Sequence, residues 1–515
     1  MREDIQLLPT KNYDSEFCGS IPIQLINLIQ PHGFILLLDK SFTIVQVSEN
    51  VKQHIHTEAR QLVHQKFTSF LSPEQQGAFR KKLAGRKQHH RIPHVLQLKV
   101  KGQEQRFAST ILIYPEHYLL ELEPLEEESN DITFIRAYQD IKAITTAMQE
   151  ADDIDTMSGI SAREIRQFSG FDRVMIYRFD SAWNGRVIAE AQEEKMEPYL
   201  GLTFPASDIP RQARQLYFKN PYRLIPDINF EPARLFPVVN PIISGFLDLS
   251  ECSLRSVPQV HVEYLKNMGV QASMSTPIIV DGKLWGLISC HHQTPKWVSF
   301  EMRYAFEVLS EMISSQVAGR QRSDRIATMN SKRSIELKII DLIYRREDLF
   351  DLLRDEADAF LSLMEASGAT LILDNRSENI GKTPKENHIK ELLKWLKLYK
   401  KEKIFITDSL AHAFSKAGAY PGLASGLLAL QFSHTPSAYL LVYRPEIIQT
   451  VNWGGNPNEA IRFEEDSKRY HPRNSFQKWQ EEVRNRALPW EEAVLSIARN
   501  LRGVLVERML MDMQE

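Results

Sequence analysis

The stretch from Phe300 to about Arg346 contains no proline and only one glycine, Gly319. Apolar residues recur along it at helical spacing. They are Met302, Phe306, Leu309 and Ile313 in its first part and Ile335, Ile339 and Leu342 in its second. A single helix of this length would span roughly 65–70 Å at about 1.5 Å per residue. One domain does not need so long a helix, so the stretch predicts a helix that joins two domains.

Length and composition predict a multidomain globular chain. At 515 residues, 43% hydrophobic and 25% charged, it has room for three or four domains with cores of their own. A formal charge of −3 gives no general attraction to nucleic acid or membranes. The chain has no run of about 18 apolar residues, and its first ten residues lack a signal-peptide core. Three scattered cysteines, Cys18, Cys252 and Cys290, are too few for a disulfide framework or a Cys-x-x-Cys metal site. We therefore expect a reduced, cytoplasmic protein without a metal, a membrane partner or a nucleic-acid partner.

The first 125 residues predict a small α+β domain. GFILLLDKSFTIVQVSEN places two apolar runs about a turn at Asp39 and Lys40, which indicates a hairpin. Leu96, Leu98 and Val100 alternate with polar residues, the period of a half-buried strand. The acidic run that begins at Glu126 marks the expected boundary.

Two further domains are expected over residues 126–321 and 322–515. The second opens with a helix that carries Ile141, Ile144 and Met148 on one face, followed by a strand from Arg173 to Phe179. Its far end, TPIIVDGKLWGLISCHH, predicts a hairpin about Asp281-Gly282. SGLLALQF and AYLLVYR form a comparable pair in the third domain, which suggests a second copy of a related fold. The expected fold class is α+β, with three sensor-type domains that each flank a central antiparallel sheet with helices and are joined by long helices.

The chain ends inside a helical pattern with Leu501, Val504, Leu505 and Met509. No stop signal precedes Glu515, so we expect an output helix that leads into a further module. The long helices either pair in a homodimer or pack on their own domains.

An unusual stretch, FPASDIPRQARQLYFKNPYR, runs from Phe204 to Arg223. Ile209 precedes Pro210 and is therefore held out of the helical region, which predicts an irregular loop around Asp208. A helix from Arg211 to Tyr217 should follow, with Pro210 near its start. Backbone carbonyls beside Arg214, Tyr217 and Arg223 suit a flat ligand with N–H donors on one side and carboxylates on the other. From composition alone, the alternative is a surface loop and helix with solvated charges.

Four separated motifs, PASDIP, CHHQTP, QPHG with Cys18 thirteen residues before Pro31, and PRNSF, resemble those of the bacterial phytochromes. These are red-light receptors that carry a linear tetrapyrrole. The resemblance covers nearly the whole chain. It implies a PAS domain to about Leu125, a GAF domain to about Gln321, and a PHY domain beyond. It also implies a red/far-red photoreceptor whose bound pigment photoisomerises.

The resemblance implies biliverdin as the cofactor, joined through a thioether to Cys18. Plant-type relatives attach a reduced bilin through a cysteine that would stand at Val260 in this chain. Because the thiolate is the nucleophile, the surroundings of Cys18 should govern its rate of attachment. Cys252 and Cys290 lie within the pocket domain and are alternative attachment points, although a buried cysteine is more often structural.

The resemblance also assigns the polar pocket residues. Arg223 and Arg255 each present a guanidinium to a propionate, the bidentate geometry that lysine lacks. Ser273 and Ser275 alternate along a strand and would serve the other propionate from one side. Relatives commonly have Ser-Pro where this chain has Pro258-Gln259, so a hydroxyl contact near a propionate should be missing here.

By the same resemblance, His261 lies beside the central pyrroles and His291 bonds the carbonyl of the terminal ring. The main-chain carbonyl of Asp208 accepts from the pyrrole N–H groups. Without the resemblance, either histidine would be interpreted as a satisfied core or surface residue. The expected cavity wall consists of Tyr177, Phe204, Ile209, Pro210, Tyr217 and Tyr264.

In the third domain, residues from about 450 to 482 resemble the phytochrome tongue, which covers the pocket. Its expected signalling residues are Trp453, Arg473 and Ser475, with Arg473 paired to Asp208. The relayed change would pass along the long helices to a histidine kinase or diguanylate cyclase module, since no catalytic site is recognisable here. The alternative function is a GAF-domain sensor of a cyclic nucleotide without a chromophore.

Overall fold

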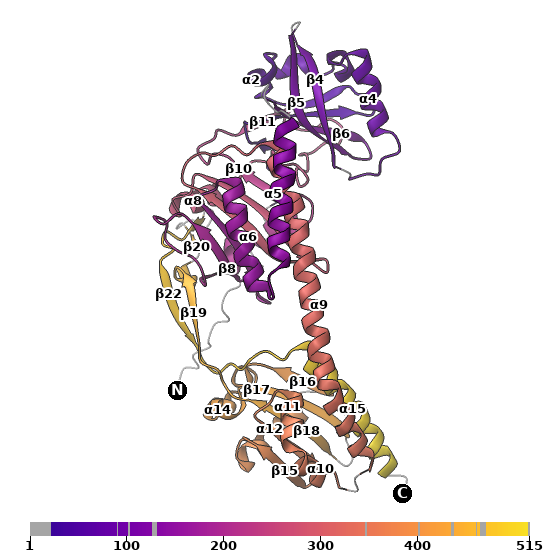
Figure 1. Cartoon of the computed structure of the whole chain (residues 1–515), viewed down its shortest axis with the longest axis vertical. Helices are drawn as coiled ribbons and strands as arrows, with labels where there is room; N and C mark the ends of the chain where they lie inside the picture. Colours follow the sequence, from indigo (N-terminus) through magenta and orange to yellow (C-terminus); the bar gives the residue numbers. More distant parts are fainter. Residues whose placement is uncertain are drawn as a thin grey trace. The chain divides into compact units, whose positions relative to one another are not determined.

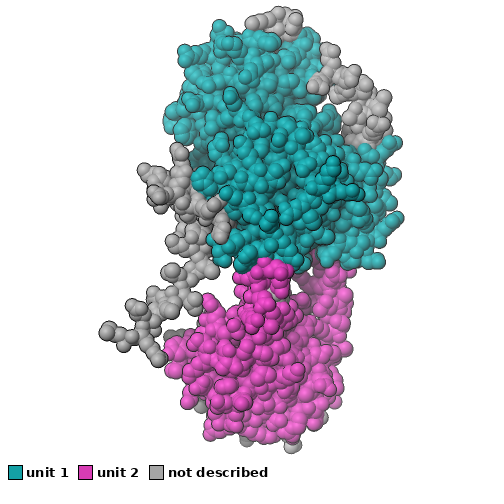
Figure 2. Space-filling view, turned by 90° about the vertical axis from the view of Figure 1, so that its left-hand side faces the viewer, with its two compact units in different colours: residues 1–318, 452–479 teal, residues 319–451, 480–515 magenta. Residues whose placement is uncertain are grey.

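A computed structural model describes residues 22–89, 91–100, 103–125, 131–345, 348–399, 402–433, 437–459, 461–463 and 470–512. The chain divides into two compact units, residues 1–318 with 452–479 and residues 319–451 with 480–515 (Figure 2). None of the described helices combines the length and apolar character needed to cross a bilayer.

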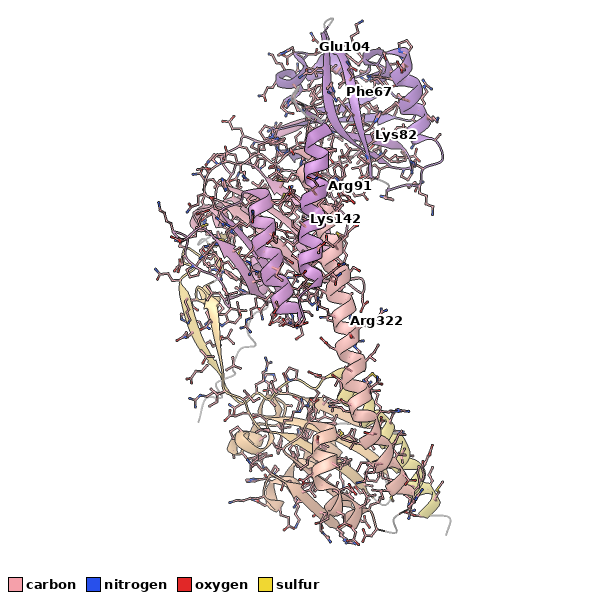
Figure 3. All side chains as sticks on the ribbon, in the orientation of Figure 1. Phe67, Lys82, Arg91, Glu104, Lys142 and Arg322 are labelled. Carbon is pink, nitrogen blue, oxygen red and sulfur yellow. The ribbon has the colours of Figure 1, made fainter. Side chains whose placement is uncertain are left out.

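The first sheet has the strand order β1-β11-β3-β2-β6-β5-β4. Its core includes Phe67, which is fully buried (Figure 3). The predicted hairpin at Asp39 and the strand through Leu96 are both confirmed. The elements are β1 (Leu28–Ile29), β2 (Phe34–Asp39), β3 (Ile44–Ser48), α2 (Val51–Ile55), α3 (Ala59–Leu62), a 3-10 helix (Phe67–Phe70), α4 (Pro73–Leu83), β4 (Arg91–Val100), β5 (Gln103–Ile113) and β6 (His117–Pro124).

One strand of the first sheet comes from far along the chain. β11 (Ala233–Phe236) pairs with both β1 and β3. Gln30 N–H also donates to Leu254 O at 2.7 Å, and Ser256 N–H donates to Leu28 O at 2.9 Å. Residues 233–256 therefore form backbone hydrogen bonds with the segment around β1 on both of its edges. The sequence did not predict this interlocking, because hydrophobic periodicity carries no information on pairing between distant strands.

The second sheet has the order β10-β12-β13-β7-β8-β9-β19-β22. The predicted strand Arg173–Phe179 is β7, and the predicted hairpin is formed by β12 and β13. Asp281 and Gly282 have φ values of 48° and 74°, as the two-residue turn requires. The elements are α5 (Asp131–Gln149), α6 (Ile154–Ser169), β7 (Arg173–Phe179), β8 (Gly185–Gln192), β9 (Thr203–Phe204), a 3-10 helix (Ala206–Asp208), α7 (Arg211–Leu216), β10 (Arg223–Ile225), α8 (Gln259–Asn267), β12 (Ala272–Val280) and β13 (Lys283–His292).

Helices α5, α6 and α9 (Phe300–Arg345) pack on one face of this sheet (Figure 1). Their side chains form an apolar core with the inward residues of β7, β12 and β13, through residues such as Met148, Ile165 and Phe306. The predicted long helix is confirmed as α9, with 46 residues. The opposite face of the sheet is left to the cavity described below.

The third sheet, β15-β14-β18-β17-β16, is antiparallel throughout, and the predicted pair is β17 with β18. β19 instead pairs in parallel with β9 of the second sheet through Trp453 and Thr203. The elements are α10 (Leu349–Asp355), α11 (Ala357–Met364), β14 (Gly368–Leu373), β15 (Arg376–Gly381), α12 (Glu386–Tyr399), β16 (Ile404–Thr407), α13 (Leu410–Ala413), a 3-10 helix (Ser415–Ala419), α14 (Pro421–Ala424), β17 (Gly426–Ser433), β18 (Ala438–Arg444), β19 (Gln449–Gly454), a 3-10 helix (Pro457–Glu459), β20 (Ile461–Phe463), β21 (Tyr470–Pro472), β22 (Lys478–Val483) and α15 (Glu492–Asp512).

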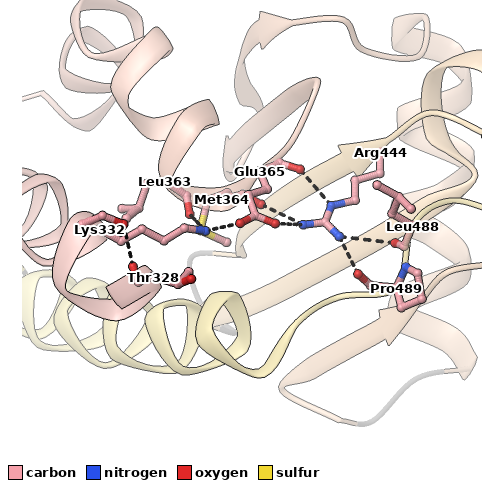
Figure 4. A network of polar contacts seen from close by, with 9 residues as sticks. Thr328, Lys332, Leu363, Met364, Glu365, Arg444, Leu488 and Pro489 are labelled. Carbon is pink, nitrogen blue, oxygen red and sulfur yellow. Dashed lines mark hydrogen bonds and ion pairs between the residues drawn. The ribbon is translucent and has the colours of Figure 1, made fainter. Parts of the chain in front are cut away.

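Arg444 at the end of β18 is the centre of a polar network in the second unit (Figure 4). It donates to Glu365 O at 2.8 Å and to Pro489 O at 2.8 Å, and its guanidinium lies 4.0 Å from the centre of the Trp490 ring. Glu365 in turn pairs with Lys332 of α9. One buried arginine thus fastens the chain just before α15 to α11.

Candidate functional site

A cavity of about 220 Å³ lies on the face of the second sheet opposite α5, α6 and α9. Its walls come from β7, β12 and β13, from the stretch between β9 and α7, and from α8. Except for Arg214, every predicted pocket residue that the structure describes lines it. These residues are Tyr177, Phe204, Asp208, Ile209, Pro210, Tyr217, Arg223, Arg255, His261, Tyr264, Ser273, Ser275 and His291.

The predicted irregular loop around Asp208 is a single 3-10 turn followed directly by α7. Pro210 has a φ of −65° and is the N-cap residue of α7. Arg214 in α7 donates to Ile209 O at 2.6 Å and to Ala206 O at 3.3 Å, and its guanidinium stacks on Trp183 at 4.7 Å. Arg214 therefore holds this turn in place, a role that the sequence did not predict.

The side chain of Asp208 is buried and forms an ion pair with Arg473. Tyr264 also donates to Asp208 Oδ2 at 2.8 Å. Burial raises the pKa of the Asp208 carboxyl, and Arg473 opposes that rise. The Asp208–Arg473 contact expected from the resemblance is thus present in the described structure.

Arg255 is buried and Arg223 is half-buried, and neither has a carboxylate partner among the described residues. Arg223 donates instead to the main-chain oxygens of Arg255 at 2.6 Å and Ser256 at 2.8 Å. Nε of Arg255 has no hydrogen-bond partner in this part of the chain. Burial and their mutual repulsion lower the pKa of Arg223, and burial lowers the pKa of Arg255. Two desolvated cations side by side constitute a site for acidic groups.

The two predicted histidines are uncharged at neutral pH. Burial lowers the pKa of His261 to about 4 and that of His291 to about 3. Nδ1 of His291 is buried with no hydrogen-bond partner among the described residues, and its Nε2 lies 3.4 Å from Ser289 Oγ. The ring of His261 stacks on Tyr264, with 5.9 Å between ring centres. Neutral imidazoles with a spare ring nitrogen can donate to or accept from a bound ligand.

Ser273 and Ser275 lie on β12 and both line the cavity, as the alternation predicted. The Ser275 hydroxyl lies 2.7 Å from the Tyr217 hydroxyl. Ser273 is the cross-strand partner of His291.

An aromatic group closes one end of the cavity around Tyr177. The Tyr177 ring lies 6.1 Å from the Phe204 ring. It occupies space that is free because Gly185 has no side chain. A Cβ on Gly185 would lie 1.7 Å from two atoms of the Tyr177 ring.

The two cysteines within the described residues lie away from the cavity lining. Cys252 and Cys290 are fully buried, and neither is a lining residue. Burial raises the pKa of both thiols. Cys18 lies outside the described residues. Ile23, five positions later, lines the cavity, and its carbonyl accepts from Arg255 Nη1 at 3.5 Å.

The described tongue segment beside Asp208 contacts α8 at several points. His471 Nδ1 lies 2.9 Å from Glu263 Oε2, and Asn267 donates to Arg473 O at 3.1 Å. The Phe476 ring lies 5.0 Å from that of Tyr264. Of the other predicted signalling residues, Trp453 pairs with Thr203, and Ser475 Oγ accepts from Gln477 N–H at 3.4 Å.

Sequence reasoning missed Arg173, Glu190 and Tyr199. Arg173 and Glu190 form a buried ion pair, and Tyr199 lines the cavity. The available signal was a charged residue at a position of β7 where the alternation predicts burial.

Fold and site together define a multidomain protein whose second domain has a cavity suited to a flat, acidic ligand. Three family models match the chain in sequence: a PAS fold over residues 18–125, a GAF domain over 153–320 and a phytochrome region over 332–514. Cyanobacterial phytochrome B of Nostoc sp. is 37% identical over 98% of this chain and 67% of its own length. A bacteriophytochrome of Pseudomonas aeruginosa is 34% identical over 96% of this chain and 66% of its own.

Among solved structures, the phytochrome photosensory core module of Stigmatella aurantiaca matches with a TM-score of 0.85 and 35% identity. It covers 96% of this chain and 98% of that one. A bacteriophytochrome from R. palustris matches with a TM-score of 0.84 and 33% identity, covering 96% and 99%.

This chain belongs to the phytochrome family and is a PAS-GAF-PHY photosensory core, a red/far-red photoreceptor with a bilin chromophore. The cavity fits such a group. A bilin carries two propionates, pyrrole N–H donors and a terminal carbonyl. The orphaned Nε of Arg255 and the spare Nδ1 of His291 are the kinds of group that these require.

Proposed function

We propose that the bilin is biliverdin and that Cys18 attaches it through a thioether. The observation that carries this proposal is the pair of desolvated guanidiniums, Arg223 and Arg255, in a cavity that residue 23 also lines. Five residues of extended chain reach roughly 16–18 Å, enough for Cys18 to enter the cavity from Ile23. The alternative thiols are buried in the apolar core with raised pKa values, which opposes thiolate formation.

The residues of the cavity would divide the work of binding. Arg223 and Arg255 would pair with one or both propionates, and Ser273 and Ser275 would donate to the propionate nearer to β12. The main-chain carbonyl of Asp208 would accept from pyrrole N–H groups, and neutral His291 would bond the terminal carbonyl. When bound, biliverdin supplies red-light absorption and a double bond that isomerises.

The contacts of Asp208 would report this change to the tongue. Tyr264 bonds Asp208 and touches Phe476, while Arg473 bonds Asp208 and stacks over Phe476 at 4.8 Å. A displacement of Tyr264 therefore alters both contacts of the tongue directly. Trp453 and Ser475 would then change partners as the segment refolds.

We also propose that the chain forms a homodimer through α9 and signals to a histidine kinase or diguanylate cyclase module. Ile326, Met329 and Leu337 of α9 are about half exposed and lie near one face of the helix. Ile326→Glu should shift the mass measured by light scattering toward the monomer. An unchanged mass would place the dimer contact elsewhere.

The first test is covalent attachment. Chain purified with biliverdin should absorb red light and fluoresce in a denaturing gel with zinc. Cys18→Ala should abolish the fluorescent band, whereas Cys252→Ala and Cys290→Ala should retain it. A band that survives in Cys18→Ala would contradict the assignment. A wild-type chain that binds a cyclic nucleotide and no pigment would contradict the proposed function as a whole.

A further inference from the structure

Arg173 is the first residue of β7 and one of the most deeply buried side chains in the described structure, with 1% of its surface exposed. Its Nε lies 2.9 Å from Glu190 Oε1, and both side chains are almost completely buried. Moving two charges out of water is costly, so a pair at this depth needs further partners to be tolerated. Arg173 donates to Gln192 Oε1 at the end of β8 at 3.1 Å. The backbone partners of Arg173 and Glu190 lie in the loop that follows.

That loop joins β8 to β9 and runs from Glu193 to Leu202. Glu190 Oε2 accepts the backbone N–H groups of Tyr199 and Leu200, each at 2.7 Å. On the other side, Arg173 Nη2 donates to the main-chain oxygen of Glu197. The ion pair thus supplies a donor and an acceptor to the loop backbone within four residues.

The guanidinium also fixes the ring that the loop presents to the cavity. Arg173 Cζ lies 4.0 Å from the centre of the Tyr199 ring. Tyr199 is buried, lines the cavity, and lies 5.7 Å from Phe204 in an edge-to-face arrangement. A cation over the ring and an edge-to-face contact with Phe204 leave Tyr199 little freedom.

Arg173 is also the cross-strand partner of His291. The Arg173 charge adds to burial and to His261 in lowering the pKa of His291. Arg173 on β7 and His261 on α8 are thus the charged or titratable groups that lower the pKa of His291, and both favour its neutral form.

We infer that Arg173 is a positioning residue of the bilin site: held by Glu190, its guanidinium fixes the loop 193–202 so that Tyr199 closes the cavity at the His291 end. This inference rests on the proposed function for the identity of the ligand, but its geometry is a property of the protein alone. Arg173 is not a lining residue of the cavity, so it acts through Tyr199 and His291 rather than on the bilin.

The test uses the chain without pigment and three variants. In Arg173→Met, the amides of Tyr199 and Leu200 should exchange with solvent at least about tenfold faster, because charge-assisted hydrogen bonds that hold the loop are lost. The pKa of His291, followed by NMR, should rise. In Arg173→Lys the two amides should still exchange faster, because lysine cannot bond Glu190 and the main-chain oxygen of Glu197 with a planar guanidinium. The pKa of His291 should stay low in this variant because the positive charge remains.

Arg303→Met is the matched control. Arg303 is equally buried and pairs with Glu123 at 2.7 Å, but it does not line the cavity or touch the loop. It should lower global stability while leaving the two amides and the pKa of His291 unchanged. If Arg173→Met behaves like Arg303→Met in both readouts, Arg173 is only a structural residue and the inference is wrong. If wild-type chain does not take up biliverdin, the proposed function fails while these measurements still decide the role of Arg173.

Discussion

Arg473→Ala tests the contact between the tongue and the cavity most directly. Arg473 and Asp208 have side chains only 3% and 5% exposed, so the substitution leaves a buried carboxylate without its cation. Removing one partner of a buried pair costs about 3–5 kcal/mol. Tyr264 keeps its bond to Asp208, so the lower end of that range applies. At about 1.4 kcal/mol per factor of ten, local opening of residues 471–477 should become roughly a hundredfold more frequent.

The assay is amide hydrogen exchange of this segment in the dark, followed by the rate of photoconversion of the biliverdin-loaded chain. Lys478→Ala is the control, because it removes one positive charge from the exposed position that directly follows this segment. Its exchange rates should match those of the wild type. The carboxyl of Asp208 should also bind a proton more readily in Arg473→Ala, since Arg473 opposes the rise in its pKa. Equal exchange rates in Arg473→Ala and the wild type would refute the argument.

Three further predictions follow from other parts of the structure. Burial lowers the pKa of four histidines, to about 4 for His32, His117 and His261 and to about 3 for His291. The unfolded chain binds more protons at these positions below about pH 6.5. The free energy of unfolding of the pigment-free chain, measured with urea, should therefore fall as the pH is lowered from about 6.5 toward 4, and a flat profile would contradict this. Gly185→Ala should displace the Tyr177 ring and alter the bilin absorption spectrum, whereas Gly77→Ala, in open space, should not; identical spectra would contradict the close packing. Arg444→Met should lower the free energy of unfolding by about 2–3 kcal/mol because carbonyl acceptors lose their donor. Arg376→Met removes an exposed ion pair and should lower it by about 1 kcal/mol or less. Equal losses in the two variants would show that the network around Arg444 adds no stability.

Much of the local structure was predictable because it depends on short-range chemistry. The turn at Asp281 and Gly282 needs left-handed backbone at both positions, and the sequence places there the residues that tolerate it. The helix α9 follows from a long stretch without proline and with apolar residues on one side. Similarly, the motif residues around Asp208 do meet in one cavity, although the turn is held by Arg214, whose role depends on contacts that no local pattern reports.

The long-range features were not predictable for a common reason. β11 contributes to the first sheet through backbone hydrogen bonds that any short extended segment can make, so its partner is fixed by topology and not by its residues. The pair Arg173 and Glu190 is formed by two charges seventeen residues apart, and only the folded sheet brings them under one loop. A charge at a position where alternation predicts burial indicates a partner, but it does not identify it.

The cavity and the tongue share residues, and this sharing determines how a signal can pass between them. Phe204 lines the cavity and lies 5.4 Å from the Arg473 guanidinium, and a Cβ on Gly454 would lie 2.7 Å from the Phe204 ring. Tyr264 lines the cavity and contacts both Asp208 and Phe476. A shift of either ring is therefore already a change in the contacts of the tongue, without a chain of intermediate residues. For this reason, a substitution that moves Phe204 or Tyr264 should change the pigment spectrum and the exchange of residues 471–477 together, and a variant that changes only one of them would show that the two are not coupled through these rings.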